Sequence, residues 1–148
     1  MLEPQPDEYY MGEALKQAHY ALEEGEIPVG AVVVCQGRII ARAYNQTEKL
    51  QDVTAHAEML AITSAANYLG GKYLQECELF VTLEPCPMCA GALSWAQLGR
   101  VVWGAADERR GFHKLGVPML HPKSSVTTGI RAEECSLLLK EFFQKLRK

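Results

Sequence analysis

The stretch ELFVTLEPCPMCAGALSWAQLGRVVWGA, residues 78–105, decides the fold. Its first part, residues 78–83, is mostly apolar and predicts a buried strand. Pro87 suits the first position of a helix, and residues 100–105 again predict a strand. Strands that alternate with helices in this way indicate an α/β domain.

The flanking sequence continues the alternation. We expect a hairpin around the turn Gln36-Gly37-Arg38, a helix that Thr54 caps, and a last helix that buries Cys135, Leu138, Leu139, Phe142 and Leu146. The expected elements are a helix over residues 7–24, strands over 29–35 and 39–45, a helix to residue 69, the central stretch, a short strand over 126–130 and a helix from 132 to the end. This order predicts an α/β fold, a three-layer α-β-α sandwich with a mixed central sheet of about five strands, with residues 1–148 forming a single domain.

Composition narrows the class of protein. The 148 residues are 48% hydrophobic, which predicts a folded chain. No basic stretch precedes an apolar run at the N-terminus, and no run of 18 apolar residues occurs, so we expect a cytoplasmic protein without a membrane segment. The net charge of −3 gives no general sign of nucleic-acid binding. Any RNA contact must therefore use a local basic patch.

Two short motifs carry the chemistry. One is His56-Ala57-Glu58 and the other is Pro85-Cys86-Pro87-Met88-Cys89. Zinc prefers a tetrahedral shell of thiolates and imidazoles, and Cys86, Cys89 and His56 supply three such ligands. Three protein ligands leave the fourth position to water, which is typical of a catalytic zinc site.

The spacing within these motifs constrains the geometry. Side chains two residues apart on a helix point about 200° away from each other, so His56 and Glu58 can converge only at a helix N-terminus. The cysteine motif also opens its helix, and we expect two helix N-termini to point at one zinc ion. Glu58 is then the general acid and base that takes a proton from the zinc-bound water.

Other interpretations of these residues exist. Cys86 and Cys89 alone could be a redox pair. A structural zinc site in a non-catalytic interaction domain would need a fourth ligand, for which Cys77, His113 and His121 are candidates. We favour the catalytic interpretation because the pattern H-x-E…P-C-x-x-C occurs complete and in order, and this pattern is typical of zinc-dependent nucleobase deaminases.

Beyond these motifs, the chain resembles the tRNA-specific adenosine deaminases of the cytidine deaminase superfamily over nearly its whole length. The matching stretches include residues 26–32, 54–58, 81–92, 99–102 and 133–143. The resemblance implies that Zn²⁺-bound hydroxide attacks C6 of the wobble adenosine of a tRNA anticodon loop, giving inosine and ammonia, in a homodimeric enzyme. It also implies site roles: zinc ligands His56, Cys86 and Cys89; catalytic Glu58; base-binding Asn45; pocket residues Ile27, Ala57 and Leu83; and RNA-contacting Phe143 and Arg147.

The alternative function is a small-molecule deaminase acting on guanine or cytosine. Gly91-Ala92-Leu93-Ser94-Trp95-Ala96 also resembles bacterial guanine deaminases, and the acidic pI fits a small substrate. The RNA hypothesis needs a basic patch, for which we expect Lys140, Lys145, Arg147, Lys148, Arg109, Arg110, Lys114 and Lys123. Two further expectations are that Trp95 and Trp103 lie in the core or a dimer interface, and that Cys35, Cys77 and Cys135 are buried structural thiols.

Overall fold

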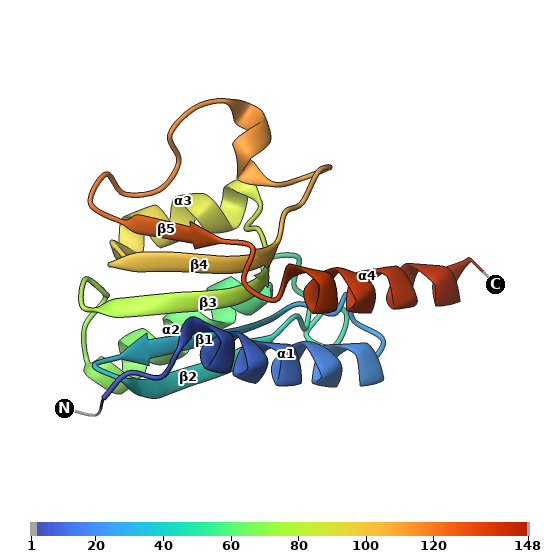
Figure 1. Cartoon of the computed structure of the whole chain (residues 1–148), viewed down its shortest axis with the longest axis horizontal. Coiled ribbons are helices and arrows are strands. Elements are labelled where there is room, and N and C mark those ends of the chain that lie inside the picture. The colour runs from blue at the N-terminus through green and yellow to red at the C-terminus, as the bar shows by residue number, and fades with distance from the viewer. Residues whose placement is uncertain (1–2, 148) are drawn as a thin grey trace.

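A computed structural model describes residues 3–147 of the chain (Figure 1). A five-stranded sheet has the strand order β2-β1-β3-β4-β5. β1 runs antiparallel to both β2 and β3, while β4 runs parallel to β3 and to β5. The elements are α1 (Asp7–Glu23), β1 (Gly30–Cys35), β2 (Arg38–Tyr44), α2 (Ala57–Leu69), β3 (Cys77–Leu83), α3 (Pro87–Ala96), β4 (Arg100–Ala105), a 3₁₀ turn η1 (Phe112–Leu115), β5 (Ser125–Thr128) and α4 (Ala132–Leu146). The expected mixed sheet and element order are confirmed.

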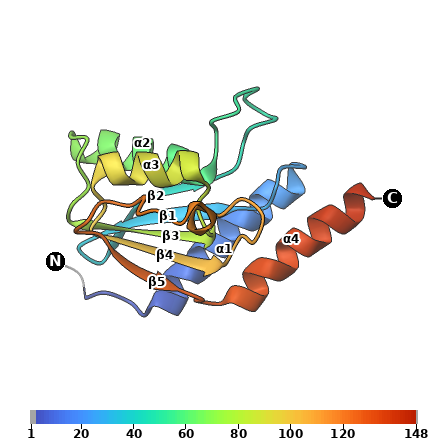
Figure 2. The same ribbon diagram turned by 90° about the horizontal axis from the view of Figure 1, so that it is seen from above.

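Helices cover both faces of the sheet, as Figure 2 shows: α2 and α3 lie on one face, and α1 and α4 on the other. Alternate residues of β1 divide between the two resulting cores. Ala31 and Val33 pack in the core under α2 and α3, whereas Val32 and Val34 pack under α1. This two-sided burial explains why β1 is a continuous apolar run and β3 a mostly apolar one.

Local sequence explains the tight connections. In the β1–β2 hairpin, Gln36 and Gly37 both have positive φ angles, 52° and 80°, as a two-residue hairpin turn of type I′ requires. Gly70 ends α2 in the left-handed region, and Pro87 opens α3 at its first position. At Gly30, a Cβ atom would lie 2.1 Å from the carbonyl oxygen of Ala14, so α1 packs directly on β1.

The predicted N-cap of α2 is wrong. Thr54 donates its amide and its hydroxyl to Asp52 Oδ1, at 2.8 and 2.7 Å, and is therefore held in a turn before the helix. The helix begins three residues later, and His56 is its N-cap. This later start brings His56 to the very end of the helix.

The predicted inner face of α4 is only partly right. Cys135 and Leu138 are buried, Phe142 is half-buried and Leu146 is 66% exposed. The reason is visible in Figure 1, where α4 projects beyond the edge of the sheet, so that its last turns have no sheet to cover. Among the described residues, no helix has the length and apolarity needed to cross a membrane.

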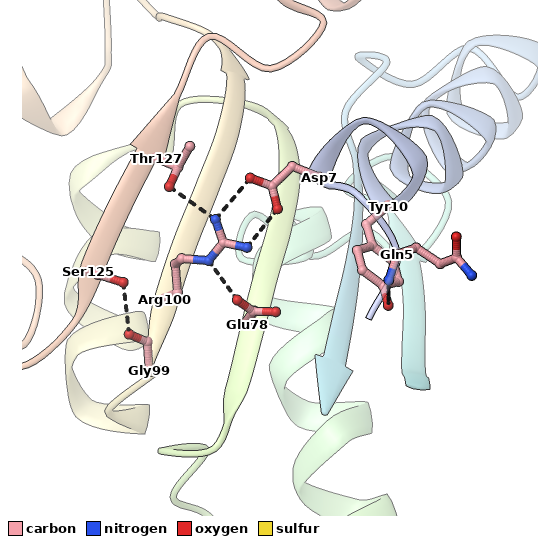
Figure 3. A network of polar contacts seen from close by, with 8 residues as sticks. All are labelled: Gln5, Asp7, Tyr10, Glu78, Gly99, Arg100, Ser125 and Thr127. Atoms are coloured by element: carbon pink, nitrogen blue, oxygen red, sulfur yellow. Dashed lines mark hydrogen bonds and ion pairs between the residues drawn. The ribbon is translucent and has the colours of Figure 1, made fainter. Parts of the chain in front are cut away.

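Arg100 ties the sheet to α1 (Figure 3). Its guanidinium donates to both carboxylate oxygens of Asp7, at 2.7 and 3.0 Å, to Glu78 at 2.6 Å and to Thr127 at 3.0 Å. The pKa of Arg100 is raised, chiefly by the hydrogen bonds to Asp7. The network links β3, β4, β5 and the first turn of α1 at one end of the sheet.

Candidate metal and catalytic site

The two chemical motifs meet at the edge of the sheet where β3 ends. His56 and Cys86 are the N-cap residues of α2 and α3, and both have extended backbone conformations. Both helices therefore direct the positive ends of their dipoles at the same point, which favours thiolate and hydroxide there. The expected convergence of two helix N-termini is observed.

The three donor atoms have a spacing that fits zinc. Nδ1 of His56 lies 3.7 Å from Sγ of Cys86 and 3.4 Å from Sγ of Cys89. A tetrahedral zinc ion with ordinary Zn–S and Zn–N bond lengths places a sulfur and a nitrogen about 3.6 Å apart. All three donor atoms lie within 4.8 Å of one another. The donor set, two thiols and an imidazole, is also the one that zinc prefers.

Three other candidate ligands lie elsewhere. Within residues 3–147, the group contains only His56, Cys86 and Cys89, so Cys77, His113 and His121 do not join it. His113 instead pairs with Glu84, and Cys77 is the first residue of β3, at the opposite end of that strand. A fourth protein ligand from this set, which a structural zinc site would need, is not observed.

The surroundings of Cys86 lower the pKa of its thiol, which favours metal binding. A hydrogen bond from the Cys89 thiol, with a further one from His56, lowers the pKa of Cys86 to about 4. The pKa of His56 is raised, mainly by the same bond to Cys86, while that of Cys89 is raised by its bond to Cys86 and by burial. Cys86 is thus a thiolate at neutral pH, the form that binds metal.

Glu58 lies in the first turn of α2, beside this group. Its side chain is almost fully buried, with 4% of the residue exposed. Burial raises the pKa of Glu58 to about 7, and its carboxyl group contacts the Cys89 thiol. A carboxyl group that titrates near neutral pH can accept a proton and return it in one reaction cycle.

Asn45 holds the start of α2. It follows β2 directly and is 8% exposed. Its Oδ1 accepts a hydrogen bond of 2.8 Å from the amide of Ala57, the first residue of the helix. The side-chain NH₂ group is therefore the part of the amide that remains for a ligand. Ala57 itself is fully buried.

The remaining predicted site residues divide into two sets. Ile27, which is 42% exposed, precedes β1, and half-buried Leu83 is the last residue of β3, so both lie at the same sheet edge as the donor group. Phe143 and Arg147 are exposed near the end of α4. The structure does not bring these two into the donor group, although α4 projects from this side of the sheet (Figure 1).

The sequence did not predict the roles of two buried carboxylates that lie near the site. Glu84 directly follows β3 and is 3% exposed. It accepts hydrogen bonds from the amides of Asp107 and His113, at 3.1 and 3.0 Å, and from Nδ1 of His113 at 2.7 Å. The amide of Phe112 also donates to the carbonyl of Pro85 at 3.0 Å. Glu84 thereby fixes the loop after β4 next to the cysteine motif; the only sequence signal was an acidic residue at the end of a buried strand.

Glu26 has a similar role for a second loop. It is 1% exposed, and it accepts hydrogen bonds from the amides of Glu48 and Lys49, at 3.1 and 2.8 Å. The loop it holds joins β2 to α2, between Asn45 and His56. No pattern in the sequence indicates this role, because the closest donors are backbone amides.

The candidate basic residues gather in two places. Arg109, Arg110, Lys114 and Lys123 are exposed in the segment between β4 and β5, and Lys140, Lys145 and Arg147 are exposed on or just after α4. Lys148 lies outside the described residues. Arg109, Arg110 and Lys114 follow β4, and Lys140, Lys145 and Arg147 lie on or just after the helix that projects from the end of the sheet that carries the donor group. Lys123 instead precedes β5, which runs parallel to β4, so it lies at the opposite end of the sheet and does not join the expected patch.

Comparison with known proteins gives matches over most of the chain. The family described as "Cytidine and deoxycytidylate deaminase zinc-binding region" matches residues 4–105. The tRNA-specific adenosine deaminase of Aquifex aeolicus (strain VF5) is 47% identical in an alignment 145 positions long, which covers 95% of each protein.

Solved structures agree with this similarity. A structure from studies of A-to-I editing by tRNA:A34 deaminases at the wobble position of transfer RNA has a TM-score of 0.83 and 41% identity, covering 88% of this chain and 99% of that one. A guanine deaminase from Nitrosomonas europaea has a TM-score of 0.81 but 26% identity, covering 96% of this chain and 86% of that one.

Proposed function

Because the chain belongs to the zinc-binding cytidine and deoxycytidylate deaminase family, and within it to the tRNA-specific adenosine deaminases, we propose that it converts the wobble adenosine of a tRNA anticodon loop to inosine by hydrolysis. The observation that carries the proposal is the group formed by His56, Cys86 and Cys89, with buried Glu58 beside it. Zinc is the cofactor, and these three residues would hold it.

The mechanism divides the work between the metal and the protein. Zinc, when bound, would act as a Lewis acid and lower the pKa of a bound water molecule to about 7. Glu58 takes the proton of that water and passes protons to the ring nitrogen and to the leaving amine. Its buried carboxyl group, with a pKa of about 7, suits both halves of this task.

Asn45 positions the base in this proposal. Its Oδ1 is occupied by the amide of Ala57, so its NH₂ group donates to the adenine. Ile27 and Leu83 contribute apolar surface to the pocket, whereas fully buried Ala57 acts through its amide, which orients Asn45. An adenine in an anticodon loop enters such a pocket at low cost, because loop bases are already unstacked or easily splayed out.

In this proposal, exposed residues around the end of the sheet that carries the donor group bind the RNA. Arg109, Arg110 and Lys114 after β4, with the lysines of α4, meet the phosphate backbone. Phe143 and Arg147 contact the loop nucleotides. Because the net charge is −3, affinity depends on this local patch and falls as salt rises.

A small-molecule deaminase is the second candidate, supported by the similarity to guanine deaminase. One experiment separates the two. The zinc-loaded protein is incubated with an anticodon stem-loop bearing a wobble adenosine, with the same stem-loop bearing guanosine there, and with free guanine and cytosine. Inosine from the first substrate alone supports the proposal. Ammonia from a free base, with none from either RNA, would replace it by the second candidate.

We also propose a homodimer and a cytoplasmic location, where tRNA is available. The support for a dimer, beside the family resemblance, is exposed apolar surface on the α2–α3 side. Trp95 on α3 is 83% exposed and Met88 is 38% exposed, while Val53, in the loop before α2, is 85% exposed. Sedimentation of the wild-type protein and of Trp95→Glu tests the dimer. A monomeric wild-type protein at micromolar concentration would rule it out.

A further inference from the structure

Two thiols face each other at the end of the sheet opposite the metal site. Cys35 is the last residue of β1 and Cys77 is the first residue of β3. The two strands are antiparallel neighbours, and their register pairs Cys35 with Cys77 directly. Both side chains lie on the same face of the sheet, at the core beneath α2 and α3.

The hydrogen bonds of Cys77 identify the type of pair. Its amide donates to the carbonyl of Leu74, and its carbonyl accepts from the amide of Gly99 on the β4 side, both at 3.0 Å. Neither group points to Cys35, so the two cysteines form a non-hydrogen-bonded pair. In such pairs the Cα atoms are about 4.5 Å apart and the side chains come closest. Disulfides form at Cα separations of about 4.4–6.8 Å.

The two thiols differ in access. Cys35 is half-buried, beside the hairpin turn, whereas Cys77 is 1% exposed. Burial, with a further contribution from the contact with the Cys35 thiol, raises the pKa of Cys77 to about 12. A reagent in solution therefore reaches Cys35 first, and Cys77 reacts only with its neighbour.

We propose that Cys35 and Cys77 form a reversible disulfide when the protein meets a small-molecule disulfide such as oxidised glutathione. The Cys35 thiolate attacks one sulfur of the reagent and displaces one thiolate. Cys77 then loses its proton and attacks Cys35 Sγ, which releases the second thiolate. Two electrons pass from the protein sulfurs to the reagent, one disulfide is exchanged for another, and the two protons end on the released thiols.

The bond would enclose a functional part of the chain. The residues between the two cysteines include Asn45, His56 and Glu58. A cross-link that closes a loop of about 40 residues restricts the unfolded chain, and we expect the melting temperature to rise by about 5 °C or more. Non-hydrogen-bonded pairs, with Cα atoms about 4.5 Å apart, lie near the lower end of the range for disulfides, and the strain in such a bond favours ready reduction.

The test uses the full-length, zinc-loaded protein and oxidised glutathione at pH 8. After free thiols are alkylated, a protease that cleaves after glutamate yields one peptide of residues 27–48 and one of residues 77–78, separate from Cys86, Cys89 and Cys135. Mass spectrometry should find these two peptides joined, and dithiothreitol should separate them. The melting temperature should rise on oxidation and fall back on reduction.

Matched variants complete the experiment. Cys35→Ser should lose the cross-link and the temperature shift, whereas Cys135→Ser, which removes another buried cysteine, should keep both. A mixed glutathione disulfide that remains on Cys35, with Cys77 alkylated after denaturation, would overturn the proposal. So would a link from Cys35 to Cys86 or Cys89. The wild-type peptides decide the matter even if a variant fails to fold.

Discussion

Asn45 holds two roles that substitution can separate. Its Oδ1 accepts the amide hydrogen of Ala57 at 2.8 Å, and its NH₂ group is proposed to donate to the target base. Asn45→Ala removes both. Asn45→Asp keeps an oxygen acceptor for the Ala57 amide, now as a carboxylate at a helix N-terminus, where negative charge is favourable. The aspartate, however, has no NH₂ group to offer the base.

The structure sets the size of each effect. Asn45→Ala leaves a buried amide without its acceptor, which costs about 1–3 kcal/mol. With an entropy of unfolding of roughly 0.3 kcal/mol/K for a chain of this length, the melting temperature falls by about 3–10 °C. Loss of one hydrogen bond to the base, at about 2–3 kcal/mol, lowers kcat/KM by about 30- to 150-fold.

We therefore expect Asn45→Ala to lose stability and activity, and Asn45→Asp to lose activity alone. Thermal melts followed by circular dichroism give the first quantity, and inosine formation from a stem-loop gives the second. Zinc content is measured in each variant as the control for an intact metal site. An Asn45→Asp protein with wild-type kcat/KM would refute the base-binding role, and an Asn45→Ala protein with a wild-type melting temperature would refute the helix-holding role.

Three further predictions concern the site and the sheet. Glu58→Gln should lower kcat in the stem-loop assay by about 10²- to 10⁴-fold while zinc stays bound, because the substitution removes only the group that carries the proton. Turnover at the wild-type rate would exclude Glu58 from that role. Zinc affinity, measured by competition with a chelator, should fall as the pH is lowered, and the fall should begin above the ordinary histidine value of 6.5. The reason is that protons compete for His56, whose pKa is raised by its hydrogen bond to Cys86. An affinity independent of pH would contradict His56 as a ligand. Arg100→Met should destabilise the protein by about 2–3 kcal/mol in urea, because it leaves the partly buried carboxylates of Asp7 and Glu78 without their partner. Lys49→Met, which breaks an exposed ion pair, is the control with an expected loss below about 1 kcal/mol, and equal losses in the two variants would disprove this account of Arg100.

The sequence predicted the elements whose signals are local. Pro87 opens α3 as expected, and the turn after Cys35 closes the hairpin as expected, because each depends only on the backbone preferences of neighbouring residues. The helix cap at Thr54 was predicted wrongly for a related reason. The side chain of Asp52, two residues away, offered a competing acceptor and retained Thr54 in a turn.

The donor group could also be predicted, because zinc imposes its own residue types and spacing on a sequence. The contacts of Glu84 and Glu26 could not, because their partners are amides of loops that are distant in sequence. The two tryptophans show the same limit. Trp103 is 8% exposed and packs in the core, whereas Trp95 is 83% exposed. An apolar residue type alone does not indicate which face of an element meets the core.

The hydrogen bonds of Glu84 determine which part of the loop after β4 can vary in length. Glu84 binds the segment after β4 as far as His113, whose amide donates to its carboxylate. The next side-chain hydrogen bond that fixes this segment to another part of the chain is the one from the hydroxyl of Ser124 to the carbonyl of Leu98. The loop between these two points is mostly exposed and is anchored at both of its ends. Insertions or deletions between these two points would leave the metal donors in place, so the length of this segment can change while the hydrolytic centre stays the same.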